Sequence, residues 1–147
     1  MYAFTETVDI DASPARVWQA LCVPAEVVQW DAGVSAALDA PADYPQPGQH
    51  VRWRCSGVTF RILHDRPAEV IHERKLRSRL RRGPFHYDET YTLTGRDGGS
   101  RLTAALEVRL PLGVIGWLLE RVYAARQTQT AVRAALAAIK RHCEADC

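Results

Sequence analysis

The most restrictive feature of this chain is a long helical pattern near its C-terminus. From Val114 to Cys143, apolar residues recur at intervals of three and four, with Gln129 the one polar residue in the series. This spacing predicts an amphipathic helix of about eight turns. The region before it carries mainly strand signals. A helix of this length has one natural position beside such strands, which is the concave face of a curved sheet. The apolar series is Ile115, Leu118, Val122, Ala125, Val132, Leu136, Ile139 and Cys143.

The start of the chain predicts one strand followed by two short helices. Apolar and polar residues alternate from Tyr2 to Ile10, apart from Glu6, which indicates a half-buried strand. Ser13 is then a suitable N-cap, and Pro14 is tolerated at the first helical position because its missing N–H would have no partner there. A second short helix is expected to begin at Pro24 and to end near Gly33.

Strand signals fill the middle of the chain. The proline-rich segment 41–48 reads as a surface loop, and the segment 94–99 reads as a hairpin turn because it is rich in glycine and aspartate. With the first strand, these elements predict a seven-stranded antiparallel sheet in an α+β fold. The six further strands are expected at Val34–Ala40, His50–Ser56, Val58–Asp65, Glu69–Leu80, Phe85–Thr94 and Arg101–Leu110.

Length and composition predict one domain, 1–147, of an ordinary globular kind, with 147 residues and a net charge of +2. No apolar run approaches the roughly 18 residues that a membrane span needs. The N-terminus lacks the features of a signal peptide, so we expect a cytoplasmic protein. The four cysteines are widely spaced, with no CxxC pair, and are expected to be free thiols: Cys22, Cys55, Cys143 and Cys147.

Three short motifs resemble those of a known group. The segment Ile10–Trp18 is similar to the junction between the first strand and first helix of the polyketide cyclase/dehydrase and lipid-transport proteins of the START-like superfamily. Trp30 lies where that group closes its second helix, and Gly98–Thr103 resembles its turn before the last strand. The resemblance implies a helix-grip fold around a largely apolar cavity. It also implies a small hydrophobic ligand, no cofactor and, for some members, a role in antibiotic biosynthesis.

Strand alternation indicates which residues face that cavity. Arg74 and Glu89 are expected to face inward on neighbouring strands and to meet there. Glu89 or His72 is then a candidate general base, and Arg74, Tyr87 and Tyr91 are candidates to stabilise a developing oxyanion. The alternative is a structural ion pair surrounded by core tyrosines, because ion pairs perturb pKa values as catalytic groups do.

The remaining candidates form the lining of the expected cavity. His64 and His72 have no third ligand at a supporting spacing, so no metal site is expected. Arg126 and Gln129 are expected near the cavity mouth, or else as tolerated polar residues on the terminal helix. The ligand-binding candidates are Trp53, Phe60, His64, Tyr87, Tyr91, Leu106, Val108, Leu118, Val122, Arg126 and Gln129.

An arginine-rich run extends from Arg74 to Arg82. Alternation sends Lys75, Arg77, Arg79 and Arg81 to the outer face of the sheet. This run is either a solvated strand that resists edge pairing or a binding surface for an acidic partner, such as a carrier protein, a membrane surface or RNA. Nucleic acid is not expected, because no aromatic residues are interleaved with the run.

Three functions therefore stay open from the sequence. The chain could be a cofactor-free cyclase or dehydrase, a non-catalytic carrier of a lipid or quinone, or an interaction protein that uses its basic strand. Whether it is an enzyme is not decided by its residues, because residue types do not fix the shape of the cavity.

Overall fold

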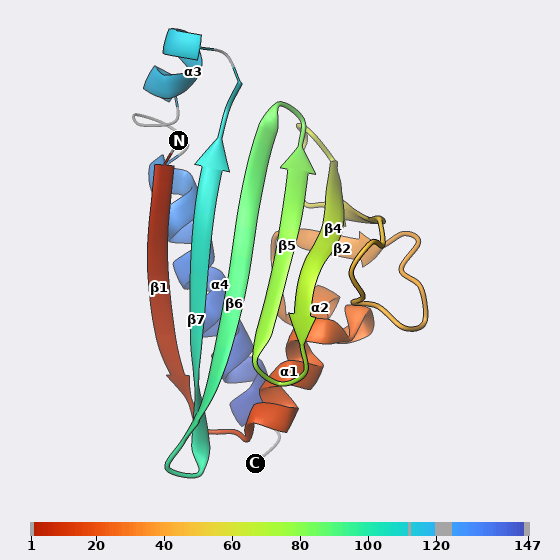
Figure 1. Cartoon of the computed structure of the whole chain (residues 1–147), viewed down its shortest axis with the longest axis vertical. Coiled ribbons are helices and arrows are strands. Elements are labelled where there is room, and N and C mark those ends of the chain that lie inside the picture. Colours follow the sequence, from red (N-terminus) through yellow and green to blue (C-terminus); the bar gives the residue numbers. More distant parts are fainter. Residues whose placement is uncertain (1, 112, 120–124, 146–147) are drawn as a thin grey trace.

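A curved antiparallel sheet of seven strands forms the frame of the protein (Figure 1). The structure is a computed structural model that describes residues 2–111, 113–119 and 125–145. The strand order is β1-β7-β6-β5-β4-β3-β2. The α+β helix-grip fold and the number of strands are thus confirmed. The strands are β1 (Tyr2–Ile10), β2 (Val34–Ala37), β3 (Val51–Cys55), β4 (Ile62–Ile71), β5 (Lys75–Arg82), β6 (Phe85–Arg96) and β7 (Gly99–Arg109).

Three helices lie behind the sheet in the view of Figure 1, and a fourth lies beyond its upper end. The start of α1 is as predicted: Pro14 is its first residue, and the Ser13 hydroxyl accepts a hydrogen bond from the Arg16 N–H at 3.2 Å. The two short helices after the first strand are likewise confirmed. The helices are α1 (Pro14–Cys22), α2 (Pro24–Trp30), α3 (Gly113–Leu119) and α4 (Ala125–Glu144).

Helix α4 packs mainly along β1, at one side of the concave face (Figure 1). A small polar network holds it there. The Gln129 amide donates to Glu6 Oε1 at 2.8 Å and accepts from the Tyr2 hydroxyl at 3.1 Å, and Arg133 Nε donates to the same Glu6 oxygen at 2.9 Å. Gln129, the polar residue in the apolar series of the helix, therefore holds α4 against the edge strand β1.

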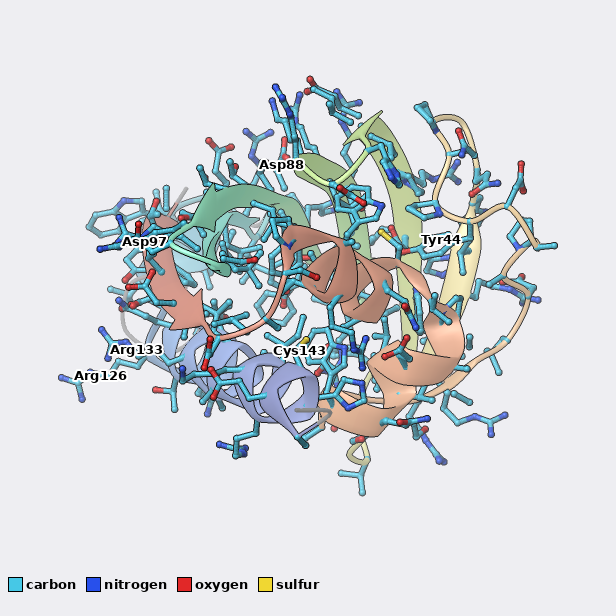
Figure 2. The ribbon with its side chains drawn as sticks, turned by 90° about the horizontal axis from the view of Figure 1, so that it is seen from below. Tyr44, Asp88, Asp97, Arg126, Arg133 and Cys143 are labelled. Carbon is cyan, nitrogen blue, oxygen red and sulfur yellow. The ribbon has the colours of Figure 1, made fainter. Side chains whose placement is uncertain are left out.

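The main hydrophobic core lies where α1 and α4 meet β1, β6 and β7. Ile10, Val17, Leu102 and Ile139 are at most 2% exposed. Figure 2 shows Cys143 between α4 and the shorter helices. Cys22, Cys55 and Cys143 are free and buried, whereas Cys147 lies outside the described residues.

The predicted boundary between two central strands is wrong. Strands expected at Val58–Asp65 and Glu69–Leu80 are in fact β4 and β5, and the turn between them lies at residues 72–74. Pro67 falls in the gap between the two predicted strands, but it is accommodated inside β4 because the pairing with β5 shifts between Pro67 and Glu69. The turn is instead made at Glu73, which has a positive φ of 59°. This displacement moves several side chains to the other face of the sheet.

The predicted terminal helix is confirmed only for its second part. A single helix was expected from Val114 to Cys143, but Gly113–Leu119 forms the separate helix α3 beyond the end of the sheet (Figure 1). The spacing of apolar residues could not predict a break between two helices, because α3 is apolar on every side. Residues 120–124, which include Val122, lie outside the described residues. No helix within the described part of the chain is long and apolar enough to cross a membrane.

Truncation of Ile139 tests the position of the core. Ile139 is 1% exposed on α4, so Ile139→Ala leaves a cavity and is expected to lower the free energy of unfolding by roughly 2–5 kcal/mol. The matched control is Ile115→Ala on α3, where the side chain is 68% exposed and the expected change is within about 0.5 kcal/mol. Urea denaturation measures both. Equal losses in the two variants would contradict the core described above.

Candidate functional site

One face of β6 carries polar side chains into the concave side of the sheet. Tyr87, Glu89 and Tyr91, which we call the inner polar stretch, share this face with the buried Leu93. The register places Glu89 between Leu106 of β7 and Ser78 of β5. Because side chains alternate along a strand, these neighbours face inward as well. The inner polar stretch therefore lies in the middle of the sheet.

The inner polar stretch keeps part of its surface accessible. On the same face, Leu93, Leu102 and Ala104 are no more than 5% exposed, whereas Tyr87, Glu89 and Tyr91 are only partly buried. Helix α4 contacts chiefly β1 and has few contacts with the middle of the sheet. The three side chains of the inner polar stretch are thus only partly covered, whereas their β7 neighbours Leu106 and Val108 are buried, at 4% and 0% exposed.

Glu89 is an inward carboxyl group with no hydrogen bond or ion pair to any described residue. Burial, followed by the negative charges of Asp65 and Asp31, raises its pKa from 4.5 to about 8. Burial disfavours the charged form of a carboxyl, and nearby like charges add to this effect. At neutral pH, Glu89 is therefore largely protonated and can donate a hydrogen bond as well as accept one.

Asp65 lies deeper on the same face and is 4% exposed. Its Oδ2 accepts hydrogen bonds from the Tyr44 hydroxyl at 2.6 Å and from Trp53 Nε1 at 3.1 Å. Its Oδ1 is buried without a hydrogen-bond partner among the described residues. Burial raises the pKa of Asp65, and the two hydrogen bonds offset part of this rise. Asp65 thus anchors the segment containing Tyr44 and contributes to the raised pKa of Glu89.

The two tyrosines of the inner polar stretch have free hydroxyl groups. Neither Tyr87 nor Tyr91 makes a side-chain hydrogen bond with the described part of the chain. Burial raises the pKa of both, and in Tyr91 the neighbouring Glu89 adds to the effect. Both hydroxyls therefore stay protonated near neutral pH. The Tyr87 ring stacks on Phe85, which in turn meets Phe60 edge to face, so an aromatic row continues toward the end of the sheet.

The inner polar stretch itself carries no positive charge, although the nearby Arg82 guanidinium opposes the rise that burial causes in the pKa of Tyr87. Among the arginines of β5, only Arg82 faces inward, and it is bound to the carbonyl oxygens of Ser56, Thr59 and Phe60. A carboxyl group, two hydroxyls and aromatic rings favour an uncharged ligand that is largely apolar and carries an oxygen.

Several predicted residues lie on the inner face, as alternation indicated: Trp53, Tyr87, Glu89, Tyr91, Leu106 and Val108. Their roles toward a ligand stay predictions. Phe60 lies in the loop before β4, where it is 46% exposed and contacts the ring of Phe85. Tyr87, Glu89 and Tyr91 lie along β6 with the aromatic row, whereas Trp53 lies on β3 and Leu106 and Val108 lie on β7.

The predicted Arg74–Glu89 pair is wrong. Arg74 lies in the turn between β4 and β5, where its carbonyl accepts from the Leu93 N–H, whereas Glu89 is opposite Ser78. His72 is in the same turn, with its side chain 80% exposed and 3.3 Å from Glu73. Neither residue reaches the inner polar stretch, because the turn lies farther along the chain than expected.

Other predicted lining residues also lie elsewhere. His64 is on the outer face of β4, where its ring stacks on His50 with a nitrogen–nitrogen distance of 2.8 Å. Leu118 is exposed on α3, and Arg126 extends away from the protein in Figure 2. Gln129 is used to dock α4, and Val122 lies outside the described residues. No group of three potential metal ligands occurs among the residues that the structure describes.

Asp65 is the main inward residue that sequence reasoning missed. A strand beginning at Val58 placed His64 inward and Asp65 outward, whereas the true register sets Asp65 opposite Val51 and Leu63 opposite Trp53. Trp53 was the residue from which the inward orientation of Asp65 could have been predicted. A buried tryptophan usually needs an acceptor for its N–H, and the carboxylate on the next strand could have supplied one.

The outer face is strongly charged, as predicted for β5. Lys75, Arg77, Arg79 and Arg81 point away from the helices, and Arg77 forms a two-point ion pair with Asp88, at 3.0 and 2.7 Å. Figure 2 shows Asp88 on the side of the sheet away from α4. The two described surface grooves also lie on this outer face, with Asp88 and Glu107 in their linings. Their mixed charge makes them unsuited to an apolar ligand.

The comparisons with known proteins agree with this arrangement. Residues 1–144 match the sequence model of the family described as "Polyketide cyclase / dehydrase and lipid transport". No curated protein sequence matches the chain significantly. Among solved structures, the chain is similar to protein CV1439 from Chromobacterium violaceum, with a TM-score of 0.75, 17% identity and coverage of 97% of this chain and 96% of that one.

Two structures from Mycobacterium smegmatis are also similar. Protein Ms6760 gives a TM-score of 0.72 at 18% identity, with coverage of 99% of this chain and 92% of that one. A START superfamily protein gives a TM-score of 0.68 at 15% identity, with coverage of 92% and 94%. At these identities the likeness concerns the fold.

The raised pKa of Glu89 predicts a specific dependence of stability on pH. Between pH 4.5 and about 8, the unfolded chain ionises Glu89 while the folded protein keeps it protonated, so its contribution to the free energy of unfolding falls as pH rises. Glu89→Gln removes this contribution. We expect the variant to gain stability relative to the unaltered protein on going from about pH 5 to about pH 8.

Denaturation by urea across this pH range measures the effect. The matched control is Glu107→Gln on the outer face of β7, which is expected to leave the pH dependence of stability unchanged. If both variants track the unaltered protein equally across the range, Glu89 is not protonated in the folded state.

Proposed function

Because the chain belongs to the polyketide cyclase/dehydrase and lipid transport family, we propose that it binds a small, uncharged and largely apolar molecule against the inner polar stretch. The observation that carries this proposal is Glu89, which faces inward without a partner and has a pKa raised to about 8. Glu89 is only partly covered, so a ligand can reach it, and a ligand oxygen would supply the hydrogen bond that no described residue supplies.

The ligand would combine apolar bulk with a carbonyl or hydroxyl group. Protonated Glu89 donates to a carbonyl oxygen, and the hydroxyls of Tyr87 and Tyr91 lie on the same face to donate to the same or a second oxygen. Phe85 and Leu106 border the inner polar stretch and would contact the apolar part. An anionic ligand fits less well, because it would add a negative charge near Asp65 and would favour no ionised group on this face.

Acid–base catalysis is the second candidate, and the pKa of Glu89 favours it specifically. A group with a pKa of about 8 can both accept and donate a proton near neutral pH. In a cyclisation or dehydration, ionised Glu89 would remove a proton next to a ligand carbonyl, and the hydroxyls of Tyr87 and Tyr91 would stabilise the enolate oxygen. The tyrosines would thus stabilise the oxyanion, which is the role predicted from the sequence for Arg74. This chemistry requires no cofactor.

The finer predictions from the sequence stand unchanged in this proposal. An acidic carrier protein, a role in antibiotic biosynthesis and a cytoplasmic location stay predictions. The resemblance to START-like proteins supports ligand binding in general, and the inner polar stretch supports the neutral, oxygen-bearing class within it.

Ligand capture tests the proposal. Native mass spectrometry of the purified protein, followed by denaturing extraction, is expected to find an uncharged hydrophobic molecule, either co-purified or taken from a panel of quinone-, sterol- and polyketide-like compounds. Glu89→Leu removes the hydrogen bonds but keeps apolar volume, so binding is expected to weaken by roughly tenfold. The matched control Glu107→Leu, on the outer face, is expected to bind normally.

A conservative substitution separates the two candidates. Glu89→Gln keeps the size of the side chain and a hydrogen-bond donor but cannot transfer a proton. A carrier is expected to retain its ligand in this variant, whereas an enzyme is expected to bind it and lose turnover by about two orders of magnitude or more. Preferential capture of anionic compounds, or equal losses in Glu89→Leu and Glu107→Leu, would contradict the proposed site.

A further inference from the structure

Helix α3 exposes a concentrated set of apolar side chains. Its seven residues, Gly113–Leu119, contain no charged side chain, and the only buried one is Gly116. A helix that is apolar on every side is normally buried. Here the exposed fractions are 82% for Val114, 68% for Ile115, 50% for Trp117, 54% for Leu118 and 44% for Leu119. A contiguous exposed surface of this kind marks a contact with a partner or a membrane.

A second exposed apolar segment lies at the same end of the sheet. Val58 is 95% exposed and Phe60 is 46% exposed in the loop that leads into β4. The Phe60 ring contacts Phe85, the first residue of β6, and the register pairs the start of β6 with the end of β7 through His86 and Arg109. Figure 1 shows α3 beyond this same end, after β7.

Two exposed arginines lie at this end of the sheet, Arg61 next to Phe60 and Arg81 on β5 in the row of His86. Arg61, Arg79 and Arg81 are exposed and make no ion pair with a described residue. Asp88 and Glu107 lie in the same row as Arg79, two residues farther from this end than Arg81, and Asp88 is already paired with Arg77. The end of the sheet is therefore apolar in its most exposed part and positive beside it.

We propose that this end, formed by α3 and these arginines, docks onto an anionic lipid bilayer. Leu118, Ile115 and Trp117 would enter the interfacial region, where tryptophan is favoured because its ring is both apolar and polar. Arg79 and Arg81 would contact anionic headgroups, each contributing an attraction that salt weakens. This surface is separate from the inner polar stretch, and its action depends on neither of the functions proposed above.

The positive charges favour a bilayer over a second copy of the chain. A symmetric dimer formed through this end would bring the same patch of both copies together and place like-charged arginines near each other. In addition, the exposed side chains of α3 point to several sides of the helix, which a soft lipid phase can cover more fully than a flat protein surface can.

Vesicle binding tests the proposal directly. The full chain is mixed with vesicles of phosphatidylcholine alone and with an equal mixture of phosphatidylcholine and phosphatidylglycerol, and is followed by flotation and by tryptophan fluorescence. Trp18, Trp30 and Trp53 are buried, so a blue shift reports on Trp117. We expect binding to the anionic vesicles with a blue shift, and weaker binding as salt is raised.

Two variants and two controls identify the surface. The double variant Ile115→Ser, Leu118→Ser and the double variant Arg79→Glu, Arg81→Glu are each expected to weaken binding by on the order of tenfold or more. The control for apolar loss is Val23→Ser, at an exposed position 38% accessible beside α1. The control for charge reversal is Arg141→Glu, exposed near the far end of α4. Both controls are expected to bind normally.

Three outcomes would overturn the proposal. The first is no binding to anionic vesicles by a folded protein. The second is binding that the Val23→Ser and Arg141→Glu controls weaken as much as the α3 and β5 variants do. The third is a concentration-dependent dimer, seen by light scattering and lost in Ile115→Ser, Leu118→Ser, without vesicle binding. Ligand capture by the inner polar stretch is measured separately, so failure here leaves that result intact.

Discussion

The site depends on carboxyl groups that share the covered face of a sheet without a cation to neutralise them. Glu89 and Asp65 lie on neighbouring rows of the inner face, and the one inward arginine of β5, Arg82, is committed to loop carbonyls. Burial, together with the negative charges of Asp65 and Asp31, therefore keeps a proton on Glu89. Glu89 is thereby largely neutral at physiological pH but still able to form hydrogen bonds, which is what an apolar ligand with a carbonyl or hydroxyl group requires.

The alternation of side chains along β5 separates two surfaces of opposite character. Leu76, Ser78 and Leu80 face the helices, whereas the intervening basic residues face outward. The positive charges are thus kept away from Glu89, which would otherwise ionise more readily. The same strand supplies Arg81 to the outer face at the end of the sheet beyond which α3 lies. The alternation of side chains along β5 therefore places apolar and small residues on the inner face and basic residues on the outer face, where they contribute to the proposed membrane-docking surface.

The fold could be predicted from the two ends of the chain. The residues of β6 that face inward could be predicted from the alternation of side chains along a strand. The register of the central strands could not, because alternation fixes only which residues share a face within one strand. Placing the break between Asp65 and Glu69 displaced the turn to the wrong residues, brought Arg74 and His72 inward and turned Asp65 outward. A local shift in pairing decided these positions, and no sequence pattern marked it. The separation of α3 from α4 was hidden for a related reason, since apolar spacing does not distinguish a buried helix from an exposed one.

The protonation state of Glu89 tests this account most directly. Carbon-13 nuclear magnetic resonance of the glutamate side-chain carboxyls, with Glu89 assigned by its loss in Glu89→Gln, follows its ionisation in the folded protein. The account predicts a titration midpoint of about 8. A midpoint at the ordinary value of 4.5 would mean that the inner face carries negative charge at neutral pH, and the proposed binding of a neutral, oxygen-bearing ligand would lose its basis.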